Sequence, residues 1–406
     1  MAEDLHEDLI RGLKAGGRIR APEIEAAFLA VRRHHFLPSE PPNVAYRDQV
    51  VTTKVKDGIP ISASTQPSMM ATMLEQLDLR PGHQVLEIGT GTGYNAALMA
   101  HIVGERGKVV TVDLDEDIVA EARENLGRAG YARVQCVRAD GGDGHEDAAP
   151  FDRIIVTVGS WDIPPALRQQ LREGGRLVIP ISIRGPQRSV AFERRGERLT
   201  STSIVECDFS TACRGEFAGP ATRRQIAPHG GVYVWFDGSR ELDAAAAYRL
   251  LTAPSHDEST GIVATVGEVF GGIYLWLALH TVAFVQLGVA DSALPDAPCL
   301  LRIPGKLGLT AGLCGDHGMA LLDLAAEDDP PTGLDDPRWF EISMRNFGRD
   351  VEAGRELAAL TRAWDDAGRP GTDGLRVAAY PIEARYEPGP GEFVVDKRWS
   401  RLVLSW

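Results

Sequence analysis

A glycine-rich turn holds the residues with the clearest chemical potential in this sequence. The apolar stretch Val85–Ile88 is followed by Gly89–Gly93, in which glycine and threonine alternate, and Asn95 then begins a helical segment. Glycine lacks a Cβ atom, so such a backbone turns sharply and lets a ligand approach closely. The free N–H groups of the following helix point toward the same place. The pattern predicts a site for a nucleotide-type cofactor.

Two kinds of cofactor fit such a turn, and the spacing distinguishes them. The dinucleotide fingerprint is G-x-G-x-x-G, followed about 20 residues later by an acid that binds the ribose. Asp113 ends the next apolar run and provides that acid, but the glycines here are spaced G-x-G-x-G. S-adenosylmethionine has no pyrophosphate to bind, and its cationic amino-acid end suits an acid such as Glu87. The spacing therefore favours S-adenosylmethionine over NAD.

A third strand end completes the predicted site. The run Val134–Ala139 ends at Asp140, whose carboxylate is suited to accept a hydrogen bond from the adenine amino group. A plain strand–turn–helix is the alternative for a single glycine-rich turn, but three strand ends that each close on an acid disfavour it. The predicted cofactor-binding residues are Glu87, Gly89, Thr90, Gly91, Gly93, Tyr94, Asn95, Asp113, Leu114, Asp140 and Gly141.

An alternation of strand and helix patterns must position these residues. It predicts a Rossmann-like, doubly wound α/β sheet of parallel strands. The predicted strands are Gln84–Ile88, Lys108–Val112, Val134–Val137, Asp152–Val158 and Gly175–Pro180, and the helices are Asn95–Ile102, Asp115–Ala129 and Pro164–Leu171. Two antiparallel strands, Ser189–Glu193 and Leu199–Cys207, are expected to follow.

Three regions are predicted along the 406 residues, a length typical of two domains. Residues 1–78 form a helical N-terminal and substrate-loop region, and residues 79–215 form the methyltransferase-type core. From residue 220 to 406 the strand–helix alternation stops, and helical segments such as Leu242–Leu251 mix with short strands. This part is predicted to be an α+β domain that ends in a strand at Trp399–Trp406.

Composition limits the partners and the compartment. The net charge of −14 disfavours nucleic acid and an anionic membrane as partners. The five cysteines show no C-x-x-C pair, which predicts reduced thiols, no metal site and a cytoplasmic protein. The charged, amphipathic N-terminus does not have the pattern of a signal peptide.

One long stretch with few charges, Val269–Ala290, is a candidate membrane helix. Gly271 and His280 are among the residues that interrupt it. The interruptions favour a buried helix at Ile273–Leu279 and a strand at Val282–Val289.

A series of motifs runs from about Arg32 to Gly215. They are His34–Pro38 with Ala45–Asp48, Ser64–Pro67, Glu87–Asn95, Asp140–Gly141, Ala149–Val156, Ile163–Pro164 and Gln170–Pro180. Together they resemble the protein-L-isoaspartate O-methyltransferase family. The glycine loop alone would indicate only a methyltransferase, whereas Thr65–Pro67 and Pro150–Asp152 make the resemblance specific.

The resemblance implies an enzyme that uses S-adenosylmethionine to methylate a side-chain carboxylate and releases S-adenosyl-L-homocysteine. Its substrate would be a peptide or protein that carries aspartate or isoaspartate. A carboxylate is already an anion, so the reaction needs alignment and exclusion of water rather than a base. The predicted catalytic residues, which would hold the carboxylate, are Thr65 (usually serine in the family), Ser64 and Ser62.

Three further residues are predicted to contact the substrate: Gln66, Tyr46 and Trp161. Trp161 follows the fourth strand end, where open α/β sheets often bind substrates. Tyr46 also has a purely structural interpretation. Ser64 and Thr65 are equally suited to cap the helix expected at Met69–Leu77.

The extension after Gly215 separates the candidate functions. Typical repair enzymes of the family end near this position, whereas a similar extension occurs in an actinobacterial branch that modifies ribosomally synthesised peptides. The main prediction is methylation of an aspartate in a cyclised ribosomal peptide, leading to aspartimide or isoaspartate, with the extension recognising the peptide. The alternatives are repair of isoaspartyl residues in damaged proteins and a non-enzymatic, S-adenosylmethionine-dependent peptide-binding module.

Overall fold

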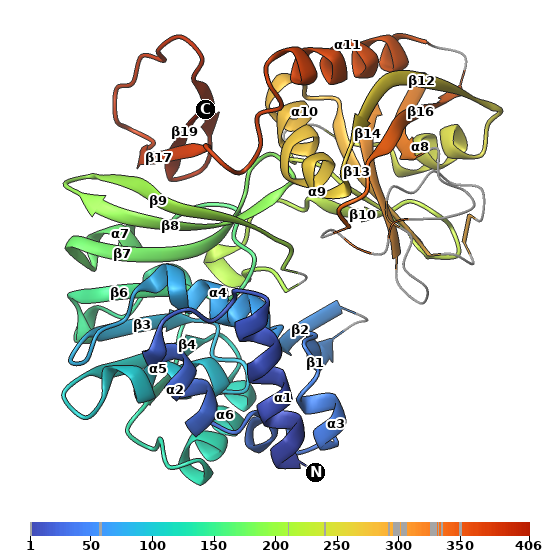
Figure 1. Cartoon of the computed structure of the whole chain (residues 1–406). Coiled ribbons are helices and arrows are strands. Elements are labelled where there is room, and N and C mark those ends of the chain that lie inside the picture. The colour runs from blue at the N-terminus through green and yellow to red at the C-terminus, as the bar shows by residue number, and fades with distance from the viewer. Residues whose placement is uncertain are drawn as a thin grey trace. The chain divides into compact units, whose positions relative to one another are not determined.

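The computed structural model describes residues 2–56, 59–209, 211–238, 241–290, 293–294, 301, 307–324, 331, 333, 336–348 and 351–406. Contacts divide the chain into two compact units (Figure 1). The first consists of Met1–Ser182, Gln187–Gly219 and Arg376–Leu404, and the second of Ile183–Pro186, Pro220–Leu375 and Ser405–Trp406. The second unit is therefore inserted into the chain of the first.

A mixed sheet forms the first unit, and its strand order among the described residues is β18-β19-β17-β9-β8-β7-β6-β3-β4-β5. The parallel half contains β3 (Gln84–Ile88), β4 (Lys108–Asp113), β5 (Gln135–Arg138), β6 (Phe151–Val156) and β7 (Leu171–Ser182). The helices α5 (Tyr94–Val103), α6 (Glu116–Arg128) and α7 (Pro165–Gln169) lie between these strands in sequence.

This arrangement confirms the predicted doubly wound α/β core, with element bounds that differ by a few residues. Strands β4 and β6 pair with opposite sides of β3. The strand order therefore reverses beside β3, and the turn after β3 lies at this switch point. Open α/β sheets bind ligands at the carboxyl ends of the strands at such a point.

The other half of the sheet is antiparallel. It contains β8 (Gln187–Arg195), β9 (Arg198–Cys207), β17 (Arg376–Pro381), β18 (Phe393–Asp396) and β19 (Ser400–Ser405). Strand β17 pairs with β9, so the end of the chain covers an edge that β9 would otherwise expose. This grouping differs from the predicted domain of residues 220–406, because 376–404 pack with the first unit.

The N-terminal part adds helices and a hairpin to the first unit. They are α1 (Ala2–Ala15), α2 (Pro22–Ala30), the 3-10 turn η1 (Arg33–Phe36), α3 (Pro42–Ala45), α4 (Pro67–Leu77), β1 (Val51–Lys56) and β2 (Ile59–Ser64). Apolar residues of α1, α2 and α4 share one buried cluster with those of α5. Strands β1 and β2 form a separate two-stranded antiparallel sheet.

An antiparallel sheet also forms the second unit, with the order β10-β11-β13-β14-β15-β16-β12 among the described residues. Its strands are β10 (Arg223–Gln225), β11 (Val232–Trp235), β12 (Ser255–Ala264), β13 (Phe284–Ala290), β14 (Leu307–Cys314), β15 (Gly318–Leu324) and β16 (Phe340–Gly348). Its helices are α8 (Ala244–Leu251), α9 (Val266–Glu268), the π-helical turn η5 (Val269–Ile273), α10 (Tyr274–His280) and α11 (Glu352–Asp366). The predicted α+β class of this part is confirmed.

Alternate residues of the strands in the second unit bury two different cores. Ala320 and Leu322 pack with α10 and α11, whereas Met319 and Leu321 pack with α8. Successive strand residues point to opposite faces, so the sheet is covered on both sides. The candidate membrane stretch Val269–Ala290 is divided among η5, α10 and β13. Within the described residues, no helix is both long and apolar enough to span a membrane.

Candidate active site

Two glycines of the predicted cofactor turn are required by its backbone and its packing. Gly89 has φ +100°, and a Cβ atom there would lie 2.7 Å from the Thr157 hydroxyl oxygen. Gly93 has φ +85°, and its Cβ would lie 3.1 Å from the Leu126 side chain. Side chains at these positions would be strained and would collide with packed neighbours. The turn at the carboxyl end of β3 therefore requires glycine at both positions.

Glu87 supports this turn from inside the protein. Its side chain is fully buried, and it accepts hydrogen bonds from Asn95 Nδ2 (2.7 Å) and the Thr111 hydroxyl (2.6 Å). The Thr111 hydroxyl also lies 2.8 Å from that of Thr90. Burial raises the pKa of Glu87 to about 7. These hydrogen bonds thus link the ends of β3 and β4 to the glycine turn and to the start of α5.

Tyr94 has a different place from the one predicted for a cofactor ligand. It is buried, and its ring packs against Phe28 and Phe36. Burial raises the pKa of its phenol above the ordinary value. Its packing is that of a core residue, which anchors the start of α5.

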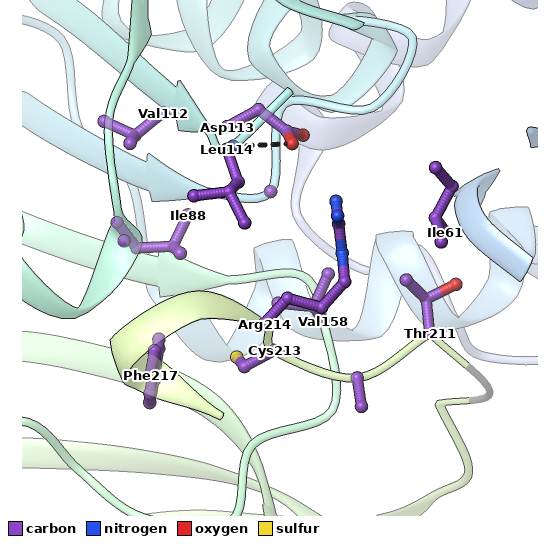
Figure 2. A pocket seen from close by; sticks show the side chains of 13 residues that line it. Ile61, Ile88, Val112, Asp113, Leu114, Val158, Thr211, Cys213, Arg214 and Phe217 are labelled. Atoms are coloured by element: carbon purple, nitrogen blue, oxygen red, sulfur yellow. Dashed lines mark hydrogen bonds between the residues drawn. The ribbon is translucent and has the colours of Figure 1, made fainter. Parts of the chain in front are cut away.

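A pocket opens at the carboxyl ends of the parallel strands (Figure 2). The lining residues are Ile61, Ile88, Gly89, Val112, Asp113, Leu114, Gly141, Val158, Thr211, Ala212, Cys213, Arg214 and Phe217. Four predicted cofactor residues, Gly89, Asp113, Leu114 and Gly141, are among them.

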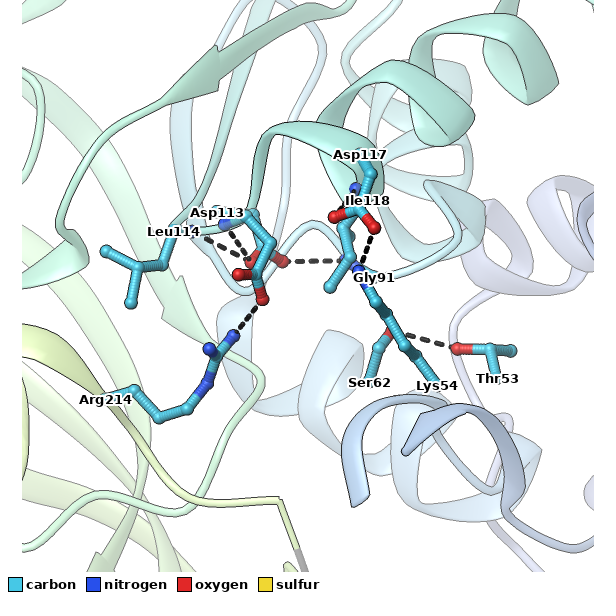
Figure 3. A network of polar contacts seen from close by, with 10 residues as sticks. Thr53, Lys54, Ser62, Gly91, Asp113, Leu114, Asp117, Ile118 and Arg214 are labelled. Atoms are coloured by element: carbon cyan, nitrogen blue, oxygen red, sulfur yellow. Dashed lines mark hydrogen bonds and ion pairs between the residues drawn. The ribbon is translucent and has the colours of Figure 1, made fainter. Parts of the chain in front are cut away.

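Asp113 is the acidic residue of the pocket wall. Its carboxylate accepts hydrogen bonds from the backbone N–H groups of Leu114 (2.8 Å) and Gly91 (3.2 Å), as Figure 3 shows. Burial raises its pKa, and the bond from Gly91 opposes that shift. A carboxylate has about four acceptor sites, so Asp113 retains capacity for a ribose hydroxyl.

Residues 211–217, which we call the closing segment, form much of the opposite wall, and sequence reasoning missed them. Gly159 N donates to Thr211 O (2.8 Å), and Cys213 N donates to Gly159 O (2.9 Å). Arg214 projects toward the strand ends (Figure 2) and forms an ion pair of 2.5 Å with Asp115. The closing segment is thus attached to two separate strand ends.

Asp140 holds this segment as well. Its carboxylate accepts from Gly142 N (2.9 Å) and from Glu216 N (2.7 Å), and it is not among the pocket-lining residues. Gly215 has φ +69°, and a Cβ there would lie 2.1 Å from the Asp140 carboxylate. A glycine at position 215 is a sequence signal for a close approach, but no neighbouring residue indicates that Asp140 is the group that approaches it.

The predicted catalytic hydroxyls lie at the end of the hairpin, next to the glycine turn. Ile61 lines the pocket, and a Cβ on Gly91 would lie 3.4 Å from the carbonyl oxygen of Ala63. Ser62 is buried and accepts a hydrogen bond of 2.9 Å from the Thr53 hydroxyl. The hairpin therefore brings residues 61–65 beside the cofactor turn.

A buried arginine fixes the end of this hairpin. The Arg33 guanidinium donates to the carbonyl oxygens of Ala45 (2.8 Å) and Thr65 (3.1 Å) and to the Ser64 hydroxyl (3.2 Å). A planar guanidinium with five N–H donors suits several acceptors at once. Arg33 thus gives Ser64 and Thr65 a defined backbone position, a role that sequence reasoning missed.

The helix-capping alternative for Ser64 and Thr65 is wrong. Helix α4 begins at Pro67, and Asp48 accepts from Ser68 N (2.8 Å). Gln66 Nε2 donates to the other oxygen of Asp48 (3.2 Å). The cap is supplied by a carboxylate from a distant turn, so capping does not account for the two hydroxyl residues.

The other predicted substrate contacts lie in different surroundings. Tyr46 is buried in the N-terminal core, where its hydroxyl lies 2.6 Å from His34 Nδ1, and burial raises its pKa to about 12. Tyr46 is thus placed as a structural residue. Trp161 is half-buried and lies three residues after the pocket-lining Val158.

The four thiols within the described residues do not form a reactive centre. Cys136, Cys207, Cys213 and Cys314 are free, and Cys299 lies outside the described residues. Burial raises the pKa of Cys136 to about 11 and that of the pocket-lining Cys213 to about 12, so both remain protonated at neutral pH. In the described part of the chain, three or more His, Cys, Asp or Glu side chains nowhere gather as a metal site would require.

These residues fit the predicted cofactor. Gly89 brings the backbone of the turn to the pocket wall, Asp113 offers a carboxylate with spare acceptor capacity, and apolar side chains such as Ile88 and Leu114 line the remainder. Such a combination of an apolar lining and a few convergent polar groups is typical of a cofactor site.

Comparison with known proteins agrees with this geometry. The family model described as protein-L-isoaspartate(D-aspartate) O-methyltransferase matches residues 3–216. A protein-L-isoaspartate O-methyltransferase of Methanopyrus kandleri is 42% identical over 46% of this chain and 84% of its own. That of Thermotoga maritima is 39% identical over 47% of this chain and 60% of its own.

A solved protein-L-isoaspartate O-methyltransferase structure matches with a TM-score of 0.50 at 26% identity. This likeness covers 92% of this chain and 96% of the other, so it extends well beyond residue 216. At least one chain of this name therefore continues beyond the position of Gly215. The present chain belongs to the protein-L-isoaspartate O-methyltransferase family and is a protein carboxyl O-methyltransferase that uses S-adenosylmethionine.

Proposed function

We propose that this enzyme methylates the side-chain carboxylate of an aspartate in a cyclised, ribosomally made peptide. The observation that carries this proposal is the second unit, which has its own buried cores and follows the segment matched by the family model. A recognition unit of this size favours one kind of peptide over many damaged proteins. We assign peptide recognition to residues 220–375.

The cofactor would be held by the turn Gly89–Gly93 and by Asp113, with Gly141 and the closing segment around it. S-adenosylmethionine supplies a methyl group that is already activated by its sulfonium. Glu87 and Asn95 keep the turn in shape from below rather than through the pocket surface. Asp140 acts through the closing segment, whose Glu216 N–H it binds.

The chain's own task is to hold the substrate carboxylate and exclude water. Ser62, Ser64 and Thr65 lie at the hairpin end that borders the glycine turn, and Arg33 fixes the backbone there. We propose that Thr65, supported by Ser64 and Ser62, donates a hydrogen bond to the carboxylate oxygen that is not methylated. No proton has to be removed, so the rate gain comes from alignment and desolvation.

In the methyl transfer, the carboxylate oxygen forms a bond to the methyl carbon, and the sulfur retains the electron pair of the broken carbon–sulfur bond. The methyl ester then reacts further without help from the enzyme. The next backbone nitrogen attacks the ester and expels methanol, which gives an aspartimide. Water then opens the aspartimide to aspartate or isoaspartate.

Mass spectrometry with two substrates tests the proposal. The enzyme is incubated with S-adenosylmethionine and either the cyclised precursor peptide encoded beside its gene or a linear isoaspartyl peptide. We expect a gain of one methyl group on the precursor, followed by loss of methanol. Turnover of the isoaspartyl peptide alone would overturn the tailoring proposal.

The second candidate is repair of isoaspartyl residues. The specific support for it is the solved protein-L-isoaspartate O-methyltransferase, which resembles this chain over 92% of its length. A chain named for isoaspartate methylation thus also continues beyond the segment matched by the family model. The same two-substrate experiment separates the candidates.

An internal deletion tests the role of the second unit. Simple truncation after Gly219 would also remove β17, β18 and β19, which belong to the first unit. A better variant replaces residues 221–374 with a flexible linker and keeps the C-terminal strands. We expect it to bind S-adenosylmethionine but to lose preference for the precursor. Unchanged preference would contradict the recognition role.

A further inference from the structure

The turn between β18 and β19 is attached to the loop that follows β6. Lys397, in this turn, is only 7% exposed. Its ammonium donates to the carbonyl oxygens of Trp161 and of Ser182, the latter at 2.5 Å. It also lies 5.0 Å from the centroid of the Trp161 ring. One buried cation thus contacts both the backbone and the side chain of Trp161.

The attachment is reciprocal, because the next residue of the loop binds the turn. Asp162 is 1% exposed, and its carboxylate accepts from Trp399 N (2.6 Å) and from the Ser400 hydroxyl. It also accepts from its neighbour Ile163 N (2.7 Å). A buried charge persists only where such partners surround it. Lys397 and Asp162 therefore define the position of residues 161–162 from the side of the C-terminal strands.

The other side of the same loop forms the wall of the pocket. Val158 lines it, and Gly159 exchanges hydrogen bonds with Thr211 and Cys213 of the closing segment. Ser160 N donates to Pro180 O (2.8 Å) at the end of β7. Trp161 thus lies between the pocket wall and the C-terminal turn, and it follows the end of β6, where a substrate of an open α/β sheet binds.

We propose that Lys397 is a positioning residue for the peptide substrate, acting through Trp161. The inference rests on the proposed function, because it takes Trp161 to be a peptide contact. Lys397 holds the ring in one orientation by contact with its face and with the main-chain carbonyl beside it. The residues of the C-terminal strands, which lie after the segment matched by the family model, thereby contribute to the substrate site.

The test separates peptide binding from cofactor binding. Lys397→Met keeps the length of the side chain but removes its charge and its donors. We expect the KM for the peptide to rise about tenfold, since a small misplacement of a contact residue is enough for such a loss. We expect kcat to stay within about twofold, and the Kd for S-adenosylmethionine to be unchanged, because the glycine turn is supported separately.

Three further single variants and one double variant separate the proposed role from a general effect on folding. Ser400→Ala removes only the hydroxyl bond to Asp162, and we expect a rise in KM of about twofold to threefold. Arg385→Met, a matched loss of an exposed cation in the same C-terminal part, should leave KM unchanged. Trp161→Ala should raise KM as Lys397→Met does, and the double variant should add little more.

The outcomes distinguish failure of the role proposed for Lys397 from failure of the proposed function. An unchanged KM in a Lys397→Met enzyme that melts and binds S-adenosylmethionine normally would overturn the inference, as would full additivity with Trp161→Ala. The measurements are made on whichever of the two peptides the wild-type enzyme methylates. If the wild type methylates neither peptide, the proposed function itself fails, and this inference fails with it.

Discussion

One wall of the pocket, formed by Ile88, Gly89 and Val112–Leu114, comes from two consecutive strand ends. The opposite wall, formed by Val158 and the closing segment, joins parts of the chain more than 50 residues apart in sequence. The first wall is supported by the fully buried Glu87 and by glycines that admit no side chain. The second is held by two backbone hydrogen bonds with Gly159, by the Asp140 carboxylate, which accepts from Glu216 N, and by the half-exposed pair of Arg214 and Asp115.

This difference suggests that the two walls bind different ligands. The glycine-turn wall has little freedom to change, since its groups are buried and mutually bonded, and we assign the cofactor to it. The opposite wall is held by contacts between separate segments, one of them a half-exposed ion pair, and we propose that it adjusts to the peptide. Changes in the first wall should therefore have larger effects than changes in the second.

The largest effect is expected from the buried carboxyl of Glu87. Between pH 4.5 and its folded pKa of about 7, the native protein keeps a proton that the unfolded chain has released. Its stability must then fall as pH rises through this window, by roughly 3 kcal/mol from this group. Glu87→Gln should remove that dependence, because the amide can accept from Asn95 and donate to Thr111. Urea unfolding at several pH values measures it.

A matched control for this prediction is Glu124→Gln on the exposed face of α6. It should retain the pH dependence of the wild type. A Glu87→Gln protein whose free energy of unfolding follows the wild-type profile would contradict the assignment of the buried proton to Glu87.

A side chain on the glycine turn should abolish most cofactor binding. Gly89→Ala combines a strained φ of +100° with a Cβ at 2.7 Å from the Thr157 hydroxyl oxygen. We expect the Kd for S-adenosylmethionine to rise about a hundredfold in calorimetric titration. Gly82→Ala is the control, since it has φ +90° but no atom within 4 Å of its Cβ. Equal affinities for these two variants would show that the clash is irrelevant.

The acid of the same wall should have an intermediate effect. Asp113→Asn keeps the shape but removes the charge that accepts from Leu114 and Gly91. We expect the affinity for S-adenosylmethionine to fall about tenfold. Asp117→Asn, at an exposed carboxylate paired with Lys54, should change it little (Figure 3). An unchanged Kd for Asp113→Asn would refute the assigned cofactor contact.

The smallest effect is expected on the opposite wall. Arg214→Met removes a half-exposed ion pair, for which a change of about threefold in the Kd for S-adenosylmethionine is reasonable at low salt. That change should vanish at high salt, where the pair is screened. Arg138→Met, at an exposed pair with Glu116, is the control and should change nothing. A loss as large as that of Gly89→Ala would remove the proposed distinction between the walls.

Much of the parallel core could be predicted from sequence because its signals are local. An apolar run, a glycine or acid at its end and a helical pattern after it belong to one short segment. Strand β3 has the predicted bounds, and Asp113 and Gly141 lie in the pocket as expected. Tyr94 belongs to the same sequence motif but is a core residue, because aromatic side chains from the N-terminal helices pack against it.

The sequence by itself therefore determined which segments form the parallel strands, the glycine turn and the acids at the strand ends, since each depends on neighbouring residues. Only the tertiary structure decided that Asp48 caps α4, that Arg33 fixes the hydroxyl-bearing hairpin, and that Lys397 reaches the loop after β6. These contacts join residues separated by as many as 236 positions. A lone charged residue carries no local pattern that names its partner, so its role emerges only when the sheet brings the two segments together.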